Sequence, residues 1–422
     1  MIFCILFLFL LVPTVHNFPI EGTEWNPDET SGLFQGDIKL TDQELAQLLN
    51  PTSPRSKRQI KYDRYWPDNL VHFEYDSGVV DQSKYTIKQA IKYIEERTCV
   101  KFVEDSKAKD RILFVYESYC SSYIGKHGGV QEVTIGWSCP LGGGGGNYAH
   151  EIFHALGITH TMSRYDRDDY LLMNISLFKG GDWVNFMKYT DYDTWNAVPF
   201  EYGSAMMYGA RPISEPREQV YRETMGNRLI TFYDIMAIHA NYECSCPKDL
   251  GCKNGGVPNP SKCDECFCPD GFGGKLCDDA PKRFSKKLMA EKDWSNFTIT
   301  FGFKGLDELD LKRVVLFIEA PKNKTIQVQV TKIENFACSN KCIYNGYEVK
   351  HMGDPRIMNP LFCCETQPLW NKTWTSKLNP TPVILYTRYD QQTIAIRYRF
   401  IDQNLADLPR KNNTFDSFEY PV

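Results

Sequence analysis

Three histidines between residues 150 and 160 constrain this 422-residue chain more than any other feature of its sequence. His150 and His154 are four residues apart, so on an α-helix both imidazoles project from one face and can bind one divalent ion. Gly157 lacks a Cβ atom and can adopt the left-handed conformation that ends a helix and turns the chain back. His160 then returns as a third ligand. Three neutral imidazoles leave one coordination position open for water, which is typical of a catalytic zinc site.

Glu151 lies next to the first of these histidines and is placed to accept a proton from water at the metal. The short string H-E-x-x-H recurs by chance, but the extended string H-E-x-x-H-x-x-G-x-x-H is far rarer. The sequence therefore predicts one catalytic Zn²⁺ ion. The remaining histidines are expected to be ordinary core or surface residues: His16, His72, His127, His239 and His351.

The apolar run at residues 2–12 is too short to cross a hydrocarbon layer of about 30 Å but suits the core of a signal peptide, which we place at 1–17. No other segment is apolar enough to predict a membrane span. Loss of Cys4 from the 15 cysteines leaves an even number, as expected for a disulfide-bonded chain in an oxidising compartment. Glycosylation sequons, which support a secreted, extracellular protein, begin at Asn174, Asn296, Asn323, Asn371 and Asn412.

A net charge of −5 gives no long-range field that would favour nucleic acid or an anionic membrane as a partner. Residues 18–58 are polar and end in the basic tetrad Arg55-Ser56-Lys57-Arg58, which is typical of sites cut by processing proteases. We therefore predict a propeptide over 18–58 and a mature chain that begins at Gln59. The alternative is a solvated run of charge.

The segment from residue 85 to 135 has the pattern of a mixed α/β lobe. Ile87, Ala90, Ile91 and Ile94 form one apolar face of a predicted helix. The β-branched and aromatic run at 112–116 and the looser alternation at 130–135 predict strands after it.

The cysteines change in density after Tyr242. Seven lie between Cys244 and Cys277, a stretch too short to bury a sufficient core, so we expect it to be stapled by disulfides. Zinc is the alternative, because Cys263 and Cys266 have ligand-like spacing. Residues 284–403 alternate apolar and polar side chains, and this predicts an all-β sandwich.

These motifs together resemble the astacin family of zinc endopeptidases within the metzincins. The likeness continues after the third histidine into residues 164–169, similar to the family's R-x-D-R-D, and into residues 204–208, similar to its S-x-M-H-Y Met-turn. It implies an α+β catalytic domain at 59–244, with two lobes around a zinc cleft. By the same resemblance, Met206 packs beneath the zinc ligands. Tyr208 is implied as an extra zinc ligand that swings away on substrate binding and stabilises the tetrahedral intermediate.

Other parts of the chain carry the same resemblance. Phe34-Gln35-Gly36-Asp37 looks like the family's propeptide motif, which implies that Asp37 caps the zinc until cleavage after Arg58. The family's two catalytic-domain disulfides would pair Cys99 with Cys244 and Cys120 with Cys139. Residues 125–135 resemble the strand at the upper rim of the cleft, beside which an extended peptide lies as an added strand.

The C-terminal modules resemble those of nematode astacins. Residues 245–278 look like an epidermal-growth-factor-like (EGF-like) module, in which only the Cys268–Cys277 pair can be assigned. Residues 284–403 resemble a divergent CUB domain with cysteines at Cys338, Cys342, Cys363 and Cys364, and residues 404–422 form a tail. The EGF-like and CUB modules imply matrix or other protein ligands.

The chain departs from the family at Thr161, where a glutamate is usual, and at Met207, where the Met-turn has histidine. The run Gly142–Gly146 is expected to be a flexible loop without chemistry. We predict a secreted, latent, zinc-dependent endopeptidase that hydrolyses extracellular proteins or peptides, with Glu151 as general base and acid. The alternative is a catalytically vestigial adhesion or matrix-binding protein that acts through its EGF-like and CUB modules.

Overall fold

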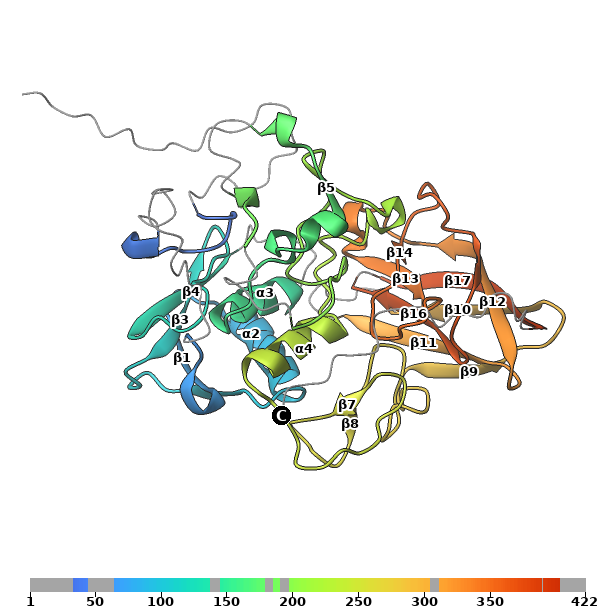
Figure 1. The fold of residues 1–422 in the computed structure, drawn as a ribbon, viewed down its shortest axis with the longest axis horizontal. Helices are drawn as coiled ribbons and strands as arrows, with labels where there is room; N and C mark the ends of the chain where they lie inside the picture. Colours follow the sequence, from blue (N-terminus) through green and yellow to red (C-terminus); the bar gives the residue numbers. More distant parts are fainter. Residues whose placement is uncertain are drawn as a thin grey trace, which may run out of the picture.

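The structure is a computed structural model that describes residues 33–44, 64–136, 145–178, 185–189, 197–303, 311–388 and 390–402. These residues form a first unit (64–244), a disulfide unit (245–278) and a sandwich unit (285–402), with the segment 33–44 lying on the first unit (Figure 1). The expected signal peptide, the basic tetrad, Cys139, Asn412 and the C-terminal tail lie outside the described residues. Among the described residues, no helix has the length and apolar character that a membrane span requires.

The first unit is built on a four-stranded parallel sheet in the order β2-β1-β3-β4. The strands predicted at 112–116 and 130–135 are both present, but two further strands precede them, so the lobe begins with a strand rather than a helix. Strand β2 has no clear signal in the sequence because most of its side chains are exposed and it has no apolar face. The bounds are β1 Leu70–Tyr75, β2 Lys101–Glu104, β3 Arg111–Glu117 and β4 Val130–Gly136.

Two helices, α2 and α3, pack against each other and on this sheet (Figure 1). Helix α2, Asp81–Glu95, buries the apolar face that the sequence predicts, including Ile87 and Ile94 with no exposed surface. Helix α3, Gly145–Ala155, carries His150 and His154. Gly157 ends its last turn with φ +91°, which is the left-handed conformation expected there.

The glycine run before α3 has a steric role at its end. A Cβ atom on Gly146 would lie 1.8 Å from the carbonyl oxygen of Arg228, so the helix can approach that backbone only with glycine at this position. Residues 142–144 lie outside the described residues. Gly145 and Gly146 therefore belong to the start of a helix rather than to the expected flexible loop.

The second half of the first unit contains more turns than regular elements. Helix α4, Phe232–Asn241, begins with a capping box in which Thr231 and Asp234 satisfy each other's backbone amides. A disulfide joins Cys99 to Cys244 and closes the unit. The short elements are β5 Leu171–Met173, β6 Ser214–Pro216 and the 3-10 helices Pro67–Asn69, Thr161–Ser163, Arg167–Asp169, Ile175–Leu177 and Gln219–Tyr221.

The disulfide unit is held by three disulfides and one small pair of strands, β7 Val257–Pro258 and β8 Cys266–Phe267. The disulfides are Cys246–Cys263, Cys252–Cys266 and Cys268–Cys277. Cys263 and Cys266 each belong to a disulfide, so neither supplies a thiolate for zinc. The structure also assigns the two pairs that the sequence left open.

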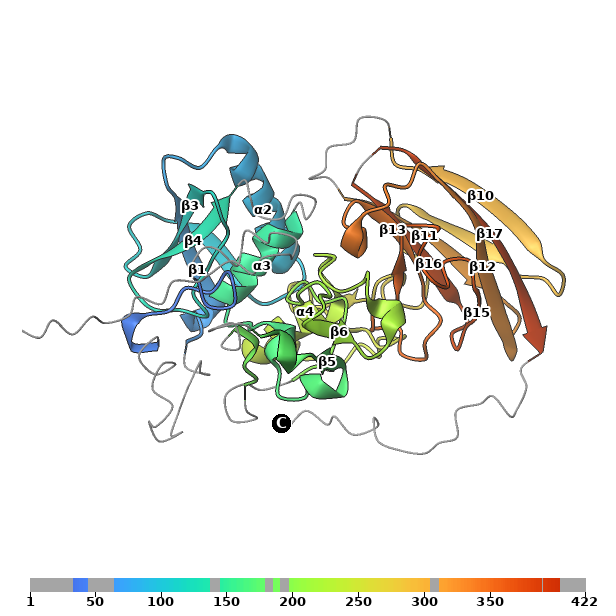
Figure 2. The same ribbon diagram turned by 90° about the horizontal axis from the view of Figure 1, so that it is seen from above.

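The sandwich unit consists of two facing sheets, as the alternating sequence predicts (Figure 2). One sheet has the order β10-β17-β12-β15 and the other β14-β13-β16-β11-β9. Disulfides Cys338–Cys364 and Cys342–Cys363 join the connection between β12 and β13 to the residues that follow β14. The bounds are β9 Ser285–Met289, β10 Ser295–Phe301, β11 Lys312–Glu319, β12 Lys324–Glu334, β13 Asn345–Val349, β14 Leu361–Phe362, β15 Thr373–Thr375, β16 Thr381–Thr387 and β17 Gln392–Asp402, with a 3-10 turn at Asn340–Cys342.

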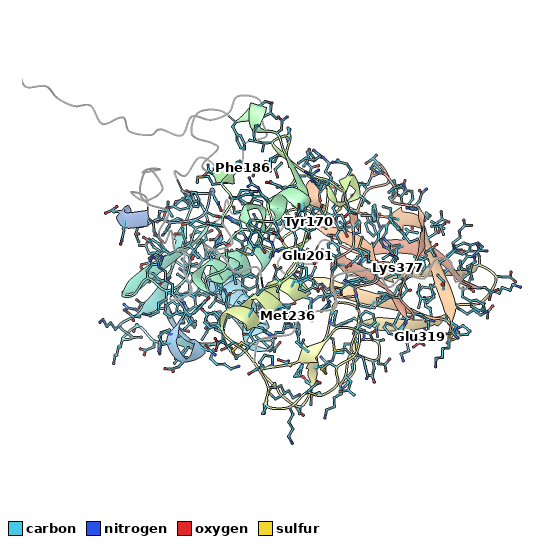
Figure 3. The ribbon with its side chains drawn as sticks, in the orientation of Figure 1. Tyr170, Phe186, Glu201, Met236, Glu319 and Lys377 are labelled. Carbon is cyan, nitrogen blue, oxygen red and sulfur yellow. A yellow bond between two sulfur atoms is a disulfide. The ribbon has the colours of Figure 1, made fainter. Side chains whose placement is uncertain are left out.

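The three units pack directly against one another. The rings of Phe232 in the first unit and Phe267 in the disulfide unit stack with centroids 4.7 Å apart. The sandwich's Arg313 forms an ion pair with Asp270 of the disulfide unit at 3.0 Å. Glu201 lies at the boundary between the first unit and the sandwich (Figure 3), where its carboxylate accepts a hydrogen bond from the backbone amide of Met358.

Candidate metal centre

Four buried side chains converge beneath helix α3: Asp37, His150, His154 and His160. The Nε2 atom of His160 lies 3.1 Å from that of His150 and 3.2 Å from that of His154. Asp37 completes the group, with Oδ2 at 3.1 Å from His150 Nε2 and 3.2 Å from His160 Nε2. Its Oδ1 lies 3.6 Å from His154 Nε2. The helix spacing and the turn at Gly157 thus bring the three predicted histidines together.

The separations between these donor atoms fit a tetrahedral zinc ion. Zinc bonds to nitrogen and oxygen of about 2.0–2.2 Å place the ligand atoms of a tetrahedron roughly 3.3–3.6 Å apart. The measured separations span 3.1–3.6 Å. Three imidazoles and one carboxylate are also donors that zinc accepts. The residues present therefore fit the metal on both geometry and chemistry.

The imidazoles are held in the form that a metal requires. Burial, and then the charge of Arg228, lower the pKa of His150 well below its usual value. Burial lowers the pKa of His160 to about 4, although Asp37 acts in the opposite direction. Both rings are therefore neutral near pH 7 and keep a lone pair for a metal.

Each ring is also oriented by an acceptor placed 2.8 Å from its Nδ1 atom. His150 Nδ1 lies beside the carbonyl of Ala205 and also 2.9 Å from a guanidinium nitrogen of Arg228, and His154 Nδ1 lies beside the carbonyl of Ile158. His160 donates to Oε1 of Gln35. These contacts orient each ring so that Nε2 faces the centre.

The segment 33–44 lies across the centre. Ile38 forms a parallel bridge with Ser122, and the backbone amide of Lys39 donates to the carbonyl of Ser122 at 2.9 Å. Gln35 also donates from Nε2 to Oγ of Ser163 at 2.8 Å. Burial alone would raise the pKa of Asp37, but the facing imidazoles, His160 foremost, lower it well below its usual value. Asp37 is therefore an ionised carboxylate that faces the three imidazole rings.

The two residues predicted to act on substrate both border this centre. Glu151 follows His150 on α3 and is buried, with 2% of its surface exposed. The ring of Tyr208 packs against His160 with centroids 4.7 Å apart and is itself 9% exposed.

The turn at residues 204–208 forms the floor of the centre. Thr161 donates from Oγ1 to Oγ of Ser204 at 3.1 Å, and Ser204 donates to Oδ1 of Asp234 at 2.5 Å. The carbonyl of Met206 accepts the amide of Thr161 at 2.9 Å, and the Met206 side chain is buried in the core of the first unit. Thr161, at a departure from the family pattern, therefore ties the third histidine's loop to this floor.

Met207, the other departure, is fully buried in a cluster of aromatic and sulfur side chains that includes Tyr208 and Met225. An apolar side chain suits this position better than an imidazole would, because the neighbours offer it mainly apolar contacts. The change is thus accommodated by packing.

Three further residues contact the centre: Gln35, which lies in the motif at 34–37, and Arg228 and Asp234, which lie in no motif that the sequence analysis identified. Arg228 donates from a guanidinium nitrogen to the Ala205 carbonyl at 2.9 Å, the same acceptor that His150 uses. Asp234 accepts the backbone amides of Ala205 and Thr231 at 2.9 and 2.8 Å. Arg228 and Asp234 reach the centre through contacts far apart in the sequence, so periodicity and spacing could not reveal them.

The remaining predicted sites are the glycosylation sequons and the second disulfide of the first unit. The sequon residues within the described part of the chain are all exposed: Asn174, Asn296, Asn323 and Asn371. Cys120 is disulfide-bonded, while its expected partner lies outside the described residues.

Comparison with known proteins places this centre in a family. Residues 58–243 match the family model described as Astacin, which is a family of peptidases. The chain is 40% identical to zinc metalloproteinase nas-17 of Caenorhabditis elegans over 425 residues, which cover 99% of this chain and 97% of that protein.

Solved structures give more partial matches. High choriolytic enzyme 1, a hatching-enzyme zinc protease of the medaka fish Oryzias latipes, is 28% identical, with a TM-score of 0.38, over 43% of this chain and 94% of its own. The CUB1-EGF-CUB2 domains of rat MASP-1 match 29% of this chain and 44% of that chain at 15% identity and a TM-score of 0.22. On the family-model match and the near full-length relative, the chain belongs to the astacin family and is a zinc metalloendopeptidase.

Proposed function

We propose that this chain is secreted as a latent zinc endopeptidase and hydrolyses peptide bonds in extracellular proteins after its propeptide is removed. The observation that carries the proposal is the seating of Asp37 among His150, His154 and His160. A carboxylate in that position occupies the place where water and a substrate carbonyl would have to bind.

The reaction needs a proton acceptor beside a water molecule and a polarised carbonyl. Zinc, when bound, supplies the positive charge that makes water acidic near pH 7 and polarises the scissile carbonyl. Glu151 accepts the proton of the attacking water and later delivers it to the leaving amine. Its burial next to His150 supports this role. A carboxylate shielded from bulk water passes the proton that it accepts to the leaving amine rather than to solvent.

Tyr208 is proposed to stabilise the oxyanion that forms during the attack. Its ring lies against His160, and this contact with a metal-ligand histidine supports the role. Loss of one such donor typically costs about 100-fold or more in rate.

Latency depends, in this proposal, on Asp37 and on cleavage after Arg58. The ionised carboxylate and the Gln35 side chain make contacts with all three histidines, and these contacts would be lost together with the propeptide.

The other two units are proposed to be an EGF-like module and a CUB-like domain that bind matrix or other protein ligands. The three disulfides of the disulfide unit and the two facing sheets of the sandwich support these assignments. The disulfides, together with exposed sequons such as Asn296, support an extracellular location.

Glu151→Ala tests the catalytic assignment. We expect the processed variant to keep its fold and its zinc but to cleave a fluorogenic peptide at least about 100-fold more slowly, because a general base contributes 10²–10⁴-fold. Glu334→Ala, an exposed substitution on β12, is the matched control and should cleave at the parent rate. Full activity in Glu151→Ala would refute the mechanism.

A further inference from the structure

The sandwich unit contacts the loop that presents Tyr208. Glu201, at the start of that loop, is 3% exposed and accepts the Met358 amide of the sandwich on Oε2 at 3.0 Å (Figure 3). Its other oxygen accepts the amide of Gly203 at 3.2 Å. One buried carboxyl group thus joins the sandwich backbone to the turn that leads into Tyr208.

The far side of the same loop is held in a similar way. The sandwich's Leu361 amide donates to Oγ1 of Thr224 at 2.9 Å, and its Lys341 amide donates to Oε2 of Glu223 at 2.8 Å. Asn227 donates from its side chain back to the Gly203 carbonyl at 3.2 Å. The two ends of the loop are therefore tied to each other and to the sandwich.

Two glycines on either side of Tyr208 lie in direct contact with sandwich side chains. A Cβ atom on Gly203 would lie 2.3 Å from Sδ of Met358. A Cβ atom on Gly209, the residue after Tyr208, would lie 2.3 Å from Cε of Lys341. The sandwich therefore packs closely against the turn on both sides of Tyr208.

The sandwich side of this contact is rigid. Disulfides Cys338–Cys364 and Cys342–Cys363 staple the segments that carry Lys341 and Leu361. Lys350, 1% exposed, donates to the carbonyl of Ile357 at 2.7 Å and so anchors the stretch that ends in Met358.

We infer that the sandwich unit is a working part of the peptidase, in which Lys341 and Met358 are positioning residues that hold the turn 203–209 and thereby Tyr208. This inference rests on the proposed role of Tyr208 as oxyanion donor. Both residues contact the turn at its glycines, and in this inference each acts through the turn. Displacing a catalytic group by about 1 Å can cost up to 10²-fold in rate, whereas ground-state binding of a long peptide depends on many other contacts.

The test uses the full chain after processing. Lys341→Ala and Met358→Ala are each made in the parent and in Tyr208→Phe, with the exposed sandwich substitutions Lys332→Ala and Met289→Ala as matched controls. We expect the two interface variants to lower kcat by roughly 3–30-fold with KM changed by less than about 2-fold. We also expect faster amide exchange in residues 203–209 with zinc content unchanged. The controls should behave as their parents.

The double variants give the decisive result. If the sandwich acts through Tyr208, the interface substitutions have little further effect in Tyr208→Phe, because residues that act as one unit are not additive. Equal losses in both backgrounds, or unchanged kcat and amide exchange, would overturn the inference. If Tyr208→Phe alone left kcat unchanged, the role proposed for Tyr208 would be wrong and the inference would fall with it. Lys341→Ala removes a partly exposed side chain, so the test does not depend on Met358→Ala remaining folded.

Discussion

Glu201→Gln replaces a buried carboxyl group with a neutral group of the same shape. Burial raises the pKa of Glu201 to about 8, although the amides of Met358 and Gly203 and the charge of Lys350 act in the opposite direction. At neutral pH the folded protein therefore holds a protonated Glu201, for which glutamine is a close mimic. The substitution removes a titration, but the NH2 group of glutamine cannot accept, so only one of the Met358 and Gly203 amides keeps its acceptor.

The expected change in stability follows from proton linkage. The folded pKa of about 8 lies above the ordinary value of 4.5, so between these pH values the folded state binds a proton that the unfolded state has released. Stability from this group is complete below pH 4.5 and is lost as the pH rises toward 8. The slope is about 1.4 kcal/mol per pH unit, so the parent should lose about 2–3 kcal/mol between pH 5 and pH 7 through this residue. The glutamine variant should lose none of it.

The assay is urea denaturation at several pH values, with disulfides kept oxidised. We expect Glu201→Gln to be about 1–3 kcal/mol less stable than the parent at pH 5, because one of the two buried backbone amides loses its acceptor. Between pH 5 and pH 7 it should gain about 2–3 kcal/mol of stability relative to the parent. Glu334→Gln, an exposed substitution on β12, controls for the loss of one carboxylate. Parallel curves for the parent and Glu201→Gln across this range would refute the reasoning.

Three further substitutions test the centre. Asp37→Ala in a chain that cannot be cleaved after Arg58 should release peptidase activity without processing, and an inactive product would contradict the role of Asp37 in latency. Gln35→Ala should raise the residual activity of that uncleaved chain about 5–30-fold, because it removes hydrogen bonds to His160 and Ser163 worth about 1–2 kcal/mol in total; unchanged activity would argue against this contact. Asp234→Ala leaves two buried backbone amides unpaired and should lower the free energy of unfolding by about 3–5 kcal/mol in urea titrations, whereas an unchanged midpoint would contradict its place in the floor.

Local patterns predicted much of the fold where burial follows a simple period. The face of α2 and the strands at 112–116 and 130–135 are examples, since each buries residues at the spacing of its own element. The alternation in residues 284–403 likewise predicted the two sheets of the sandwich. Strand β2 was not predicted, because its side chains are largely exposed and its position is set by parallel pairing with β1.

The residues of the metal centre also fall into two groups, those that a local pattern predicts and those that only tertiary packing brings together. His150, His154 and His160 lie within one helix and the turn after it, so their spacing fixes their geometry. Gln35 and Asp234 come from distant segments and reach the centre only through tertiary packing. The contact between the sandwich and the turn at Tyr208 is of this second kind, because it depends on how two folded units meet.

The central claim is that three imidazoles hold one zinc ion at which peptide bonds are hydrolysed. Elemental analysis of the folded, processed chain tests it most directly, together with peptide cleavage before and after chelation. We predict one zinc per chain, loss of that zinc in His154→Ala, and cleavage that stops on chelation and returns when zinc is restored. A folded chain that cleaves peptides without stoichiometric transition metal would contradict the account.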